Sequence, residues 1–120
     1  MARHIAKPTI IEAAGTGGKI IREFAGLVNT ETTETSIARM SSPQGWEEPA
    51  QRPDFAEYTL VLEGKIRIET ENAVFDVGAG ELFIAEKGDM VKYSTPYPGG
   101  AEYVAVCLPA FSPETVHRLD

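Results

Sequence analysis

Turn-forming residues interrupt this chain about every eight to twelve positions, which leaves room for short strands but not for helices of ordinary length. Between these turns the apolar residues alternate with polar ones, and no segment keeps the helical period of about 3.6 residues. The segments with strand character are residues 9–11, 19–24, 35–40, 58–62, 65–69, 73–77, 81–85, 91–94 and 102–108. Many short strands of this kind predict an all-β protein, either a sandwich or a barrel.

Two glycine- and proline-rich segments are expected to lie outside the strands. Residues 41–54 contain Pro43, Gly45, Pro49 and Pro53, a spacing that excludes regular structure from most of the segment and predicts a long loop. The run from Gly15 to Lys19 resembles a phosphate-binding loop only superficially, because the full spacing is missing and no helix follows. We interpret it as a hairpin turn.

Length and charge limit the possible functions. A chain of 120 residues predicts one domain, residues 1–120. Its net charge of −7 argues against binding to nucleic acid or to anionic membranes, but it says little about the ligand. The single cysteine, Cys107, cannot form an internal disulfide, and Met1–His4 lacks the apolar core of a signal peptide. Both features favour a cytoplasmic location.

Two short motifs resemble those of the cupin superfamily. In the first, Glu57 and Gly64 are separated by six residues, and in the second Gly78 to Ile84 forms a turn followed by a strand. The resemblance covers roughly residues 40–118 and implies a single cupin domain, a jelly-roll β-barrel with its core at about residues 35–110. Residues 45–49, 57–62, 93–96 and 106–113 are similar to small single-domain cupins of the ethanolamine-utilisation type, which lack the usual metal-binding histidines.

The resemblance also implies a homodimer with a polar pocket, in which we expect a small-molecule ligand. The strands within residues 9–28 are expected at the dimer interface, because Ile10, Ile11, Ile20 and Ile21 supply apolar pairs there.

The metal ligands that cupins usually carry are replaced here. Cupins typically hold a divalent metal with two histidines upstream of the glutamate and a third in the second motif. The chain has only His4 and His117, and neither lies at these positions. The corresponding positions hold Gln51 and Pro53, or Ala50 and Arg52, and then Val91. We therefore expect no cofactor and no tightly bound metal.

Glu57 is the first candidate for a catalytic residue. Strand alternation places Thr59 and Val61 on the same face, which the resemblance turns toward the barrel interior. An inward carboxyl among apolar side chains has a raised pKa and can act as a general acid or base. In the alternative interpretation, the carboxylate accepts hydrogen bonds from backbone amides or pairs with Arg52.

Four further residues are candidates for contacts with a substrate. Tyr93 shares a strand face with Val91, and its hydroxyl either orients a substrate or belongs to the core. Gln51 and Arg52 occupy the former metal positions, where Arg52 either contacts an anionic substrate or is an ordinary exposed arginine. Trp46 is either a lid over the barrel mouth or an interface anchor. Glu47 and Glu48 are expected as a solvated pair, and Cys107 as a small buried hydrophobe.

Three hypotheses of function remain open at this point. The first is an isomerase- or lyase-type enzyme with Glu57 as acid and base and with Gln51 and Tyr93 as orienting groups. The second is a non-catalytic binding or sensing module that uses the same pocket. The third is a metal-dependent enzyme that recruits Glu57, Gln51 and either Glu48 or His117. Fold-level likeness does not choose among them.

Overall fold

The structure, a computed structural model that describes residues 1–119, consists of antiparallel β-strands. The nine strands are β1 (Thr9–Ile11), β2 (Ile20–Ala25), β3 (Ser36–Ser42), β4 (Trp46–Glu47), β5 (Ala56–Glu69), β6 (Val74–Gly78), β7 (Leu82–Ala85), β8 (Lys92–Thr95) and β9 (Ala101–Leu108). The described residues contain no helix, and so none that is long and apolar enough to cross a membrane. The prediction of an all-β chain is confirmed.

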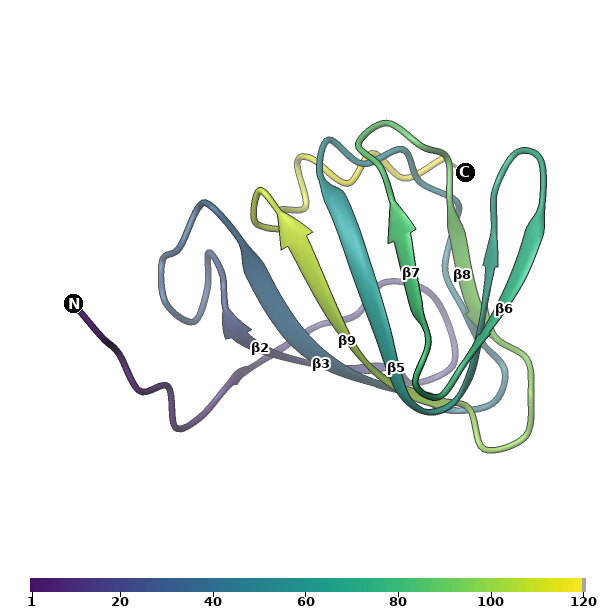
Figure 1. Ribbon diagram of the computed structural model, residues 1–120, viewed down its shortest axis with the longest axis horizontal. Coiled ribbons are helices and arrows are strands. Elements are labelled where there is room, and N and C mark those ends of the chain that lie inside the picture. Colours follow the sequence, from purple (N-terminus) through teal and green to yellow (C-terminus); the bar gives the residue numbers. More distant parts are fainter. Residues whose placement is uncertain (120) are drawn as a thin grey trace.

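The strands form one strongly curled sheet rather than two separate ones. Their order is β1-β2-β3-β9-β5-β8-β4, with β6 and β7 also paired to β5. Figure 1 shows β2, β3, β9, β5 and β7 side by side, with the sheet then curling over to β8 and β6. This arrangement is a half-barrel that closes around the core from two sides.

Strand β5 joins the two sides of the half-barrel. Its first part, from Ala56 to Gly64, pairs with β9 and β7, and its last part, from Lys65 to Glu69, pairs with β6 and β8. The sequence pattern predicts two separate strands here, 58–62 and 65–69. The structure shows one bent strand, because Gly64 adopts a φ of 77° and the pairing with β9 shifts register between Val61 and Glu63.

The loop predicted for residues 41–54 is mostly irregular, but it is not free of strand pairing. Trp46 and Glu47 form the short strand β4, whose partners on β8 are Thr95 and Ser94. This pairing turns the side chain of Trp46 into the core. The run from Gly15 to Lys19 lies in the connection between β1 and β2, as predicted for a turn, and Thr16 pairs with Glu47.

The core lies between the two sides of the half-barrel, and strand alternation decides which residues enter it. On β5, Thr59 and Val61 are buried while Leu60 and Leu62 are exposed, as the alternation predicted. The main core cluster consists of Trp46, Val61, Ile66, Ile68, Val77, Ala85, Val91, Tyr93, Ala101 and Tyr103. A smaller cluster of Phe55, Cys107 and Val116 closes one end. Between this end and the N-terminal strands the interior remains open, and the candidate site lies there.

Candidate functional site

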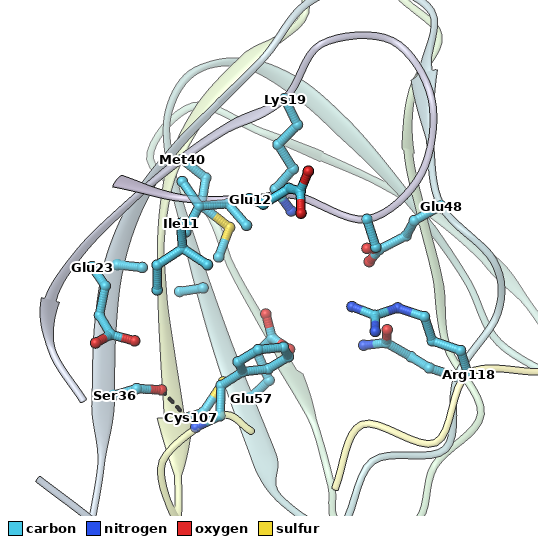
Figure 2. Close-up of a pocket in the computed structure, with 16 residues that line it drawn as sticks. Ile11, Glu12, Lys19, Glu23, Ser36, Met40, Glu48, Glu57, Cys107 and Arg118 are labelled. Carbon is cyan, nitrogen blue, oxygen red and sulfur yellow. Dashed lines mark hydrogen bonds between the residues drawn. The ribbon is translucent and has the colours of Figure 1, made fainter. Parts of the chain in front are cut away.

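A cavity opens on the concave side of the sheet, between β3, β5 and β9 and the N-terminal segment that crosses in front of them. Lys19 enters it from the N-terminal segment, Glu48 from the loop after β4, and Arg118 from the C-terminal segment, while Glu57 and Cys107 lie at its base (Figure 2). The space that water-sized groups can occupy inside it is about 70 Å³. That space holds roughly five to seven such groups, so the cavity suits a small ligand.

Glu57 projects from β5 into this cavity, on the face that the sequence pattern assigned to it. Burial disfavours its charged form and raises the pKa of the carboxyl from 4.5 to about 7. The ammonium of Lys19 opposes this shift by attraction, and Glu48 adds to it by repulsion. Within residues 1–119, the ion pair of Arg52 is to Glu71, so the Glu57–Arg52 pair of the alternative interpretation does not form. At neutral pH, Glu57 can therefore either accept or donate a proton.

Lys19 is held over two aromatic rings. Its Nζ lies 4.3 Å from the ring centroid of Trp46 and 5.5 Å from that of Tyr103. Burial by itself would lower the pKa of Lys19, but the attraction of Tyr103, Glu48 and Glu57 outweighs it and the pKa is raised. Lys19 is thus a fixed cation inside the cavity, with its stem packed among apolar groups and its charge over ring faces.

Glu48 is buried rather than solvated, which corrects the expectation for the Glu47–Glu48 pair. Because Trp46 turns inward on β4, alternation also turns Glu48 inward and leaves Glu47 exposed. Burial raises the pKa of Glu48, against the attraction of Lys19 and Arg118. Glu47 forms an ion pair with Lys92 at 3.2 Å on the surface.

Gln51 and Arg52 point in opposite directions. The backbone of Gln51 pairs with Val91 in both directions, with N–O distances of 2.8 and 2.9 Å, and its buried side chain lines the cavity. Arg52, the next residue, turns outward, where its guanidinium is paired with Glu71 at 3.0 Å and its side chain is 45% exposed. The structure therefore places Gln51 with Glu57 but does not place Arg52 in the cavity.

Tyr93 and Trp46 lie in the core beside the cavity. Both are almost fully buried, and the indole Nε1 of Trp46 donates a hydrogen bond to the carbonyl of Ala14 at 3.4 Å. Trp46 is therefore part of the structural wall under Lys19, not an exposed lid or interface anchor. The hydroxyl of Tyr93 has no hydrogen-bond partner among the described residues, and burial followed by the repulsion of Glu57 raises its pKa. Whether either residue contacts a ligand stays a prediction.

The remaining wall is formed by groups that are already satisfied. The carboxylate of Glu23 accepts hydrogen bonds from the backbone amides of Val28 and Asn29, at 3.0 and 2.8 Å. The hydroxyl of Ser36 accepts one from the amide of Phe111 at 2.9 Å. Cys107 is buried, as expected, and burial raises the pKa of its thiol well above the ordinary value, so it is no nucleophile at neutral pH.

Sequence reasoning missed the two cationic residues of the site. Lys19 ends the glycine-rich run between β1 and β2, and Arg118 lies near the C-terminus, so neither belongs to a motif. Only the curl of the sheet and the crossing of the N-terminal segment bring them to Glu57. The inward position of Glu48 could have been predicted from the sequence, because residues two positions apart on a strand share a face and Trp46 is an apolar residue.

These residues do not fit a divalent transition metal. Among residues 1–119, no three histidine, cysteine, aspartate or glutamate side chains gather closely enough to hold a metal ion. Val91, at the former histidine position, is a buried apolar residue, and His117 bonds Asp54 at 2.7 Å outside the cavity. Glu48 and Glu57 share the attraction of the Lys19 ammonium instead.

No protein-family model matches the chain. Among curated proteins, the chain is 44% identical over 100 residues to a protein named Endoribonuclease YbeY from Myxococcus xanthus (strain DK1622). The match covers 83% of this chain but only 34% of that protein, so the chain spans about a third of the length of the curated relative it matches.

Solved structures resemble the chain over nearly its whole length. An oxalate decarboxylase from Bacillus subtilis superposes with a TM-score of 0.79 at 18% identity, over 96% of this chain and 31% of that one. A protein described as a predicted oxalate decarboxylase from Thermotoga maritima superposes with a TM-score of 0.73 at 16% identity, over 91% of this chain and 99% of that one. Identities this low concern the fold alone. The chain has the cupin fold.

Proposed function

We propose that this cupin binds a small molecule in the cavity and moves a proton on it, in an isomerase- or lyase-type reaction with Glu57 as acid and base. The observation that carries the proposal is a carboxyl at the base of a small cavity whose pKa burial raises to about 7. A proton-transfer group works best when its pKa lies near the operating pH. A purely structural carboxylate would instead be paired or hydrogen-bonded, as Glu23 is.

The neighbours of Glu57 support such a step. In its charged form, Glu57 would take a proton from a carbon next to a carbonyl, and the electron pair of the broken C–H bond would move onto the carbonyl oxygen. Lys19 would stabilise the negative charge that develops there. Gln51 and Tyr93 are the orienting groups in this proposal. If the first carbon carries a hydroxyl, return of the proton to the former carbonyl carbon and transfer of the hydroxyl proton to the former carbonyl oxygen would complete an isomerisation. Return of the electron pair from the oxygen, with loss of a β-substituent as an anion, would complete an elimination.

Hydrogen exchange on carbon tests this proposal. Sugar acids, keto acids and amino alcohols are screened by thermal shift, since binding raises the melting temperature. Each hit is then incubated with the protein in D₂O, and loss of a C–H signal is followed by NMR. We expect exchange with the native protein and at least a hundredfold slower exchange with Glu57→Gln, which retains binding. Glu63→Gln, at an exposed position of the same strand and outside the cavity, is the matched control.

Binding without exchange in the native protein would favour the non-catalytic alternative. One observation supports that alternative: the N-terminal segment, including Ile11 and Ala14, forms part of the cavity wall. A ligand would therefore contact this segment, and its binding would hold the segment against the sheet.

The metal-dependent alternative has a separate test. We propose that the protein holds no transition metal tightly, because Lys19 supplies the positive charge that Glu48 and Glu57 attract. Metal analysis after dialysis against a chelator should then find far less than one equivalent of zinc, iron, manganese or nickel. A stoichiometric metal would contradict this proposal and restore the third hypothesis.

We do not extend the endoribonuclease activity named for the Myxococcus protein to this chain. The match covers only a third of that protein. A net charge of −7 opposes contact with a phosphate backbone, and a cavity with about 70 Å³ of usable space does not admit a polynucleotide.

A further inference from the structure

We propose that Lys19 binds the carboxylate of a small anionic ligand, a short hydroxy or keto acid, inside the cavity. The inference takes from the proposed function only that this cavity is a ligand site, and it does not depend on catalysis. In this proposal, Lys19 is the cation that contacts the carboxylate of the ligand.

Lys19 is a cation of the cavity that forms no close ion pair with a carboxylate, although Glu48 and Glu57 attract it. Its ammonium lies 4.3 Å from the ring centroid of Trp46, which restricts its movement. Within residues 1–119, the ion pairs shorter than 4.0 Å involve Arg39, Arg52, Arg67, Lys92 and His117, and none involves Lys19. An ammonium has three donors, so a half-buried one with no carboxylate within 4.0 Å favours an anionic acceptor.

The acidic groups of the cavity differ in the groups that they face. Burial raises the pKa of Glu48, against the attraction of Lys19 and then of Arg118. The carboxylate of Glu23 accepts hydrogen bonds from two backbone amides. Glu12 is exposed, at the mouth of the cavity. Glu57 is close to half protonated at neutral pH, so it can donate a hydrogen bond to an anion. Lys19, which has no carboxylate within 4.0 Å, and a protonated Glu57 are therefore the two donors that favour an acid over an amine.

The size of the cavity restricts the acid. Space for roughly five to seven water-sized groups fits a carboxylate with two to four further non-hydrogen atoms. Apolar neighbours such as Met40, Ile21 and Ala105 line the same space, so the ligand also needs a short carbon chain. Acids of this class are glycolate, glyoxylate and pyruvate.

Calorimetry with defined probes tests the inference. Acetate, glycolate, glyoxylate and pyruvate are titrated into the native protein, with ethylene glycol as the neutral probe and ethanolamine as the cationic probe. At least one acid should bind, and both comparison probes should bind at least tenfold more weakly. Lys19→Met should weaken binding of that acid tenfold or more, while Lys19→Arg should retain most of it. Lys65→Met is the matched control, because Lys65 also lies over a ring, 5.0 Å from that of Tyr97, but outside the cavity.

A second measurement needs no variant. Glu57 is surrounded by Lys19, Glu48, Cys107 and Arg118, and an anion placed among them would favour its protonated form. Titrations at pH 7.5 in buffers of different ionisation enthalpy should therefore show proton uptake on binding. Proton release would overturn the inference, and so would preference for ethanolamine, an unchanged affinity in Lys19→Met, or absence of binding by every acid at millimolar concentration. Acid binding without any C–H exchange would overturn only the proposed catalysis and leave this inference standing.

Discussion

Glu57 differs from Glu23 and Glu48, two buried glutamates of the cavity, in the partners that face its carboxyl. Glu23 accepts two backbone hydrogen bonds, and Glu48 faces Arg118, but Glu57 has only the opposed influences of Lys19 and Glu48. Burial favours the uncharged, protonated form of such a carboxyl. It is therefore available for proton transfer and costs stability whenever it ionises.

We expect the stability of Glu57→Gln, relative to that of the native protein, to increase as the pH rises. Because the pKa rises from 4.5 to about 7 on folding, the native state binds more protons than the unfolded state between these values. The contribution of Glu57 to stability is therefore complete below about pH 4.5 and is lost as the pH rises through 7. The advantage of the variant should grow by up to about 3 kcal/mol from pH 4.5 to pH 8.

Urea unfolding at a series of pH values measures this difference. Glu63→Gln, at an exposed position of the same strand, is the control for the amide substitution. If the free energies of unfolding of Glu57→Gln and of the native protein differ by the same amount at every pH, the pKa of Glu57 does not change on folding and the prediction is wrong. A variant that is less stable at every pH would show that the carboxylate is a structural acceptor.

Tyr93→Phe should not destabilise the protein. The hydroxyl of Tyr93 is buried without a partner among the described residues, so its removal recovers a desolvation cost of roughly 1 kcal/mol. Tyr103→Phe is the matched control, because its hydroxyl is 2.9 Å from that of Ser42 and its loss should cost about 1 kcal/mol. Thermal melts compare the two. A lower melting temperature for Tyr93→Phe would reveal a partner for its hydroxyl, such as bound water.

At the scale of elements, β5 connects the site to the rest of the fold. The strand carries Glu57 into the cavity with its first part and core residues Ile66 and Ile68 with its last part. The bend between the two parts is at Gly64, with a φ of 77°, where the strand passes closely over Gly100. A side chain at Gly64 would therefore meet both backbone strain and a collision.

We expect Gly64→Ala to destabilise the protein by about 2 kcal/mol or more. An added Cβ would overlap the carbonyl oxygen of Gly100 and would also occupy the left-handed region that favours glycine. Gly80→Ala separates the two effects, because Gly80 has a φ of 82° but no atom within 4 Å of an added Cβ. It should cost only about 1 kcal/mol. Equal melting temperatures for the two variants would show that the close approach to Gly100 has no energetic weight.

At the scale of the whole molecule, the outer face of the curled sheet is unusually apolar. This outer face is formed by exposed side chains of β3, β5, β7 and β9, namely Ile37, Leu60, Leu62, Leu82, Ile84 and Leu108. The neighbouring Arg39 and Glu102 neutralise each other at 2.6 Å. Exposed apolar patches of this kind mark contact surfaces. Two copies that each carry a charge of −7 would repel least where the surface carries no net charge.

We predict a homodimer in which a second copy packs on this outer face. Light scattering at micromolar concentration should give about twice the 13.0 kDa of the chain. Leu60→Arg and Ile84→Arg should each shift the protein to the monomer, because they bury an unpaired charge. Ile10→Arg, on β1, examines the interface expected for residues 9–28 and should leave the dimer intact. If only Ile10→Arg is monomeric, the interface lies at the N-terminal strands and not at the outer face. A monomeric native protein would refute the dimer.

Local patterns along the chain were sufficient to predict most of the strands and the inward face of β5, but they missed β4 within residues 41–54 and divided β5 into two strands. These features depend on neighbours one or two positions away, such as the alternation that buries Thr59 and exposes Leu60. The same alternation, applied to a motif resemblance, placed Glu57 in the interior. The short motif also predicted the cupin fold, because turn spacing and strand pattern act together there.

Only the tertiary structure decided which charges meet. Lys19, Glu48 and Arg118 lie in three different connecting or terminal segments, and no local rule relates them to Glu57. The structure likewise turned Trp46 into the core and Arg52 out to Glu71, because pairing across β4 and β8 and between Gln51 and Val91 sets their directions. Electrostatic interactions depend on distance in space and on burial, and a sequence specifies both only through the complete fold.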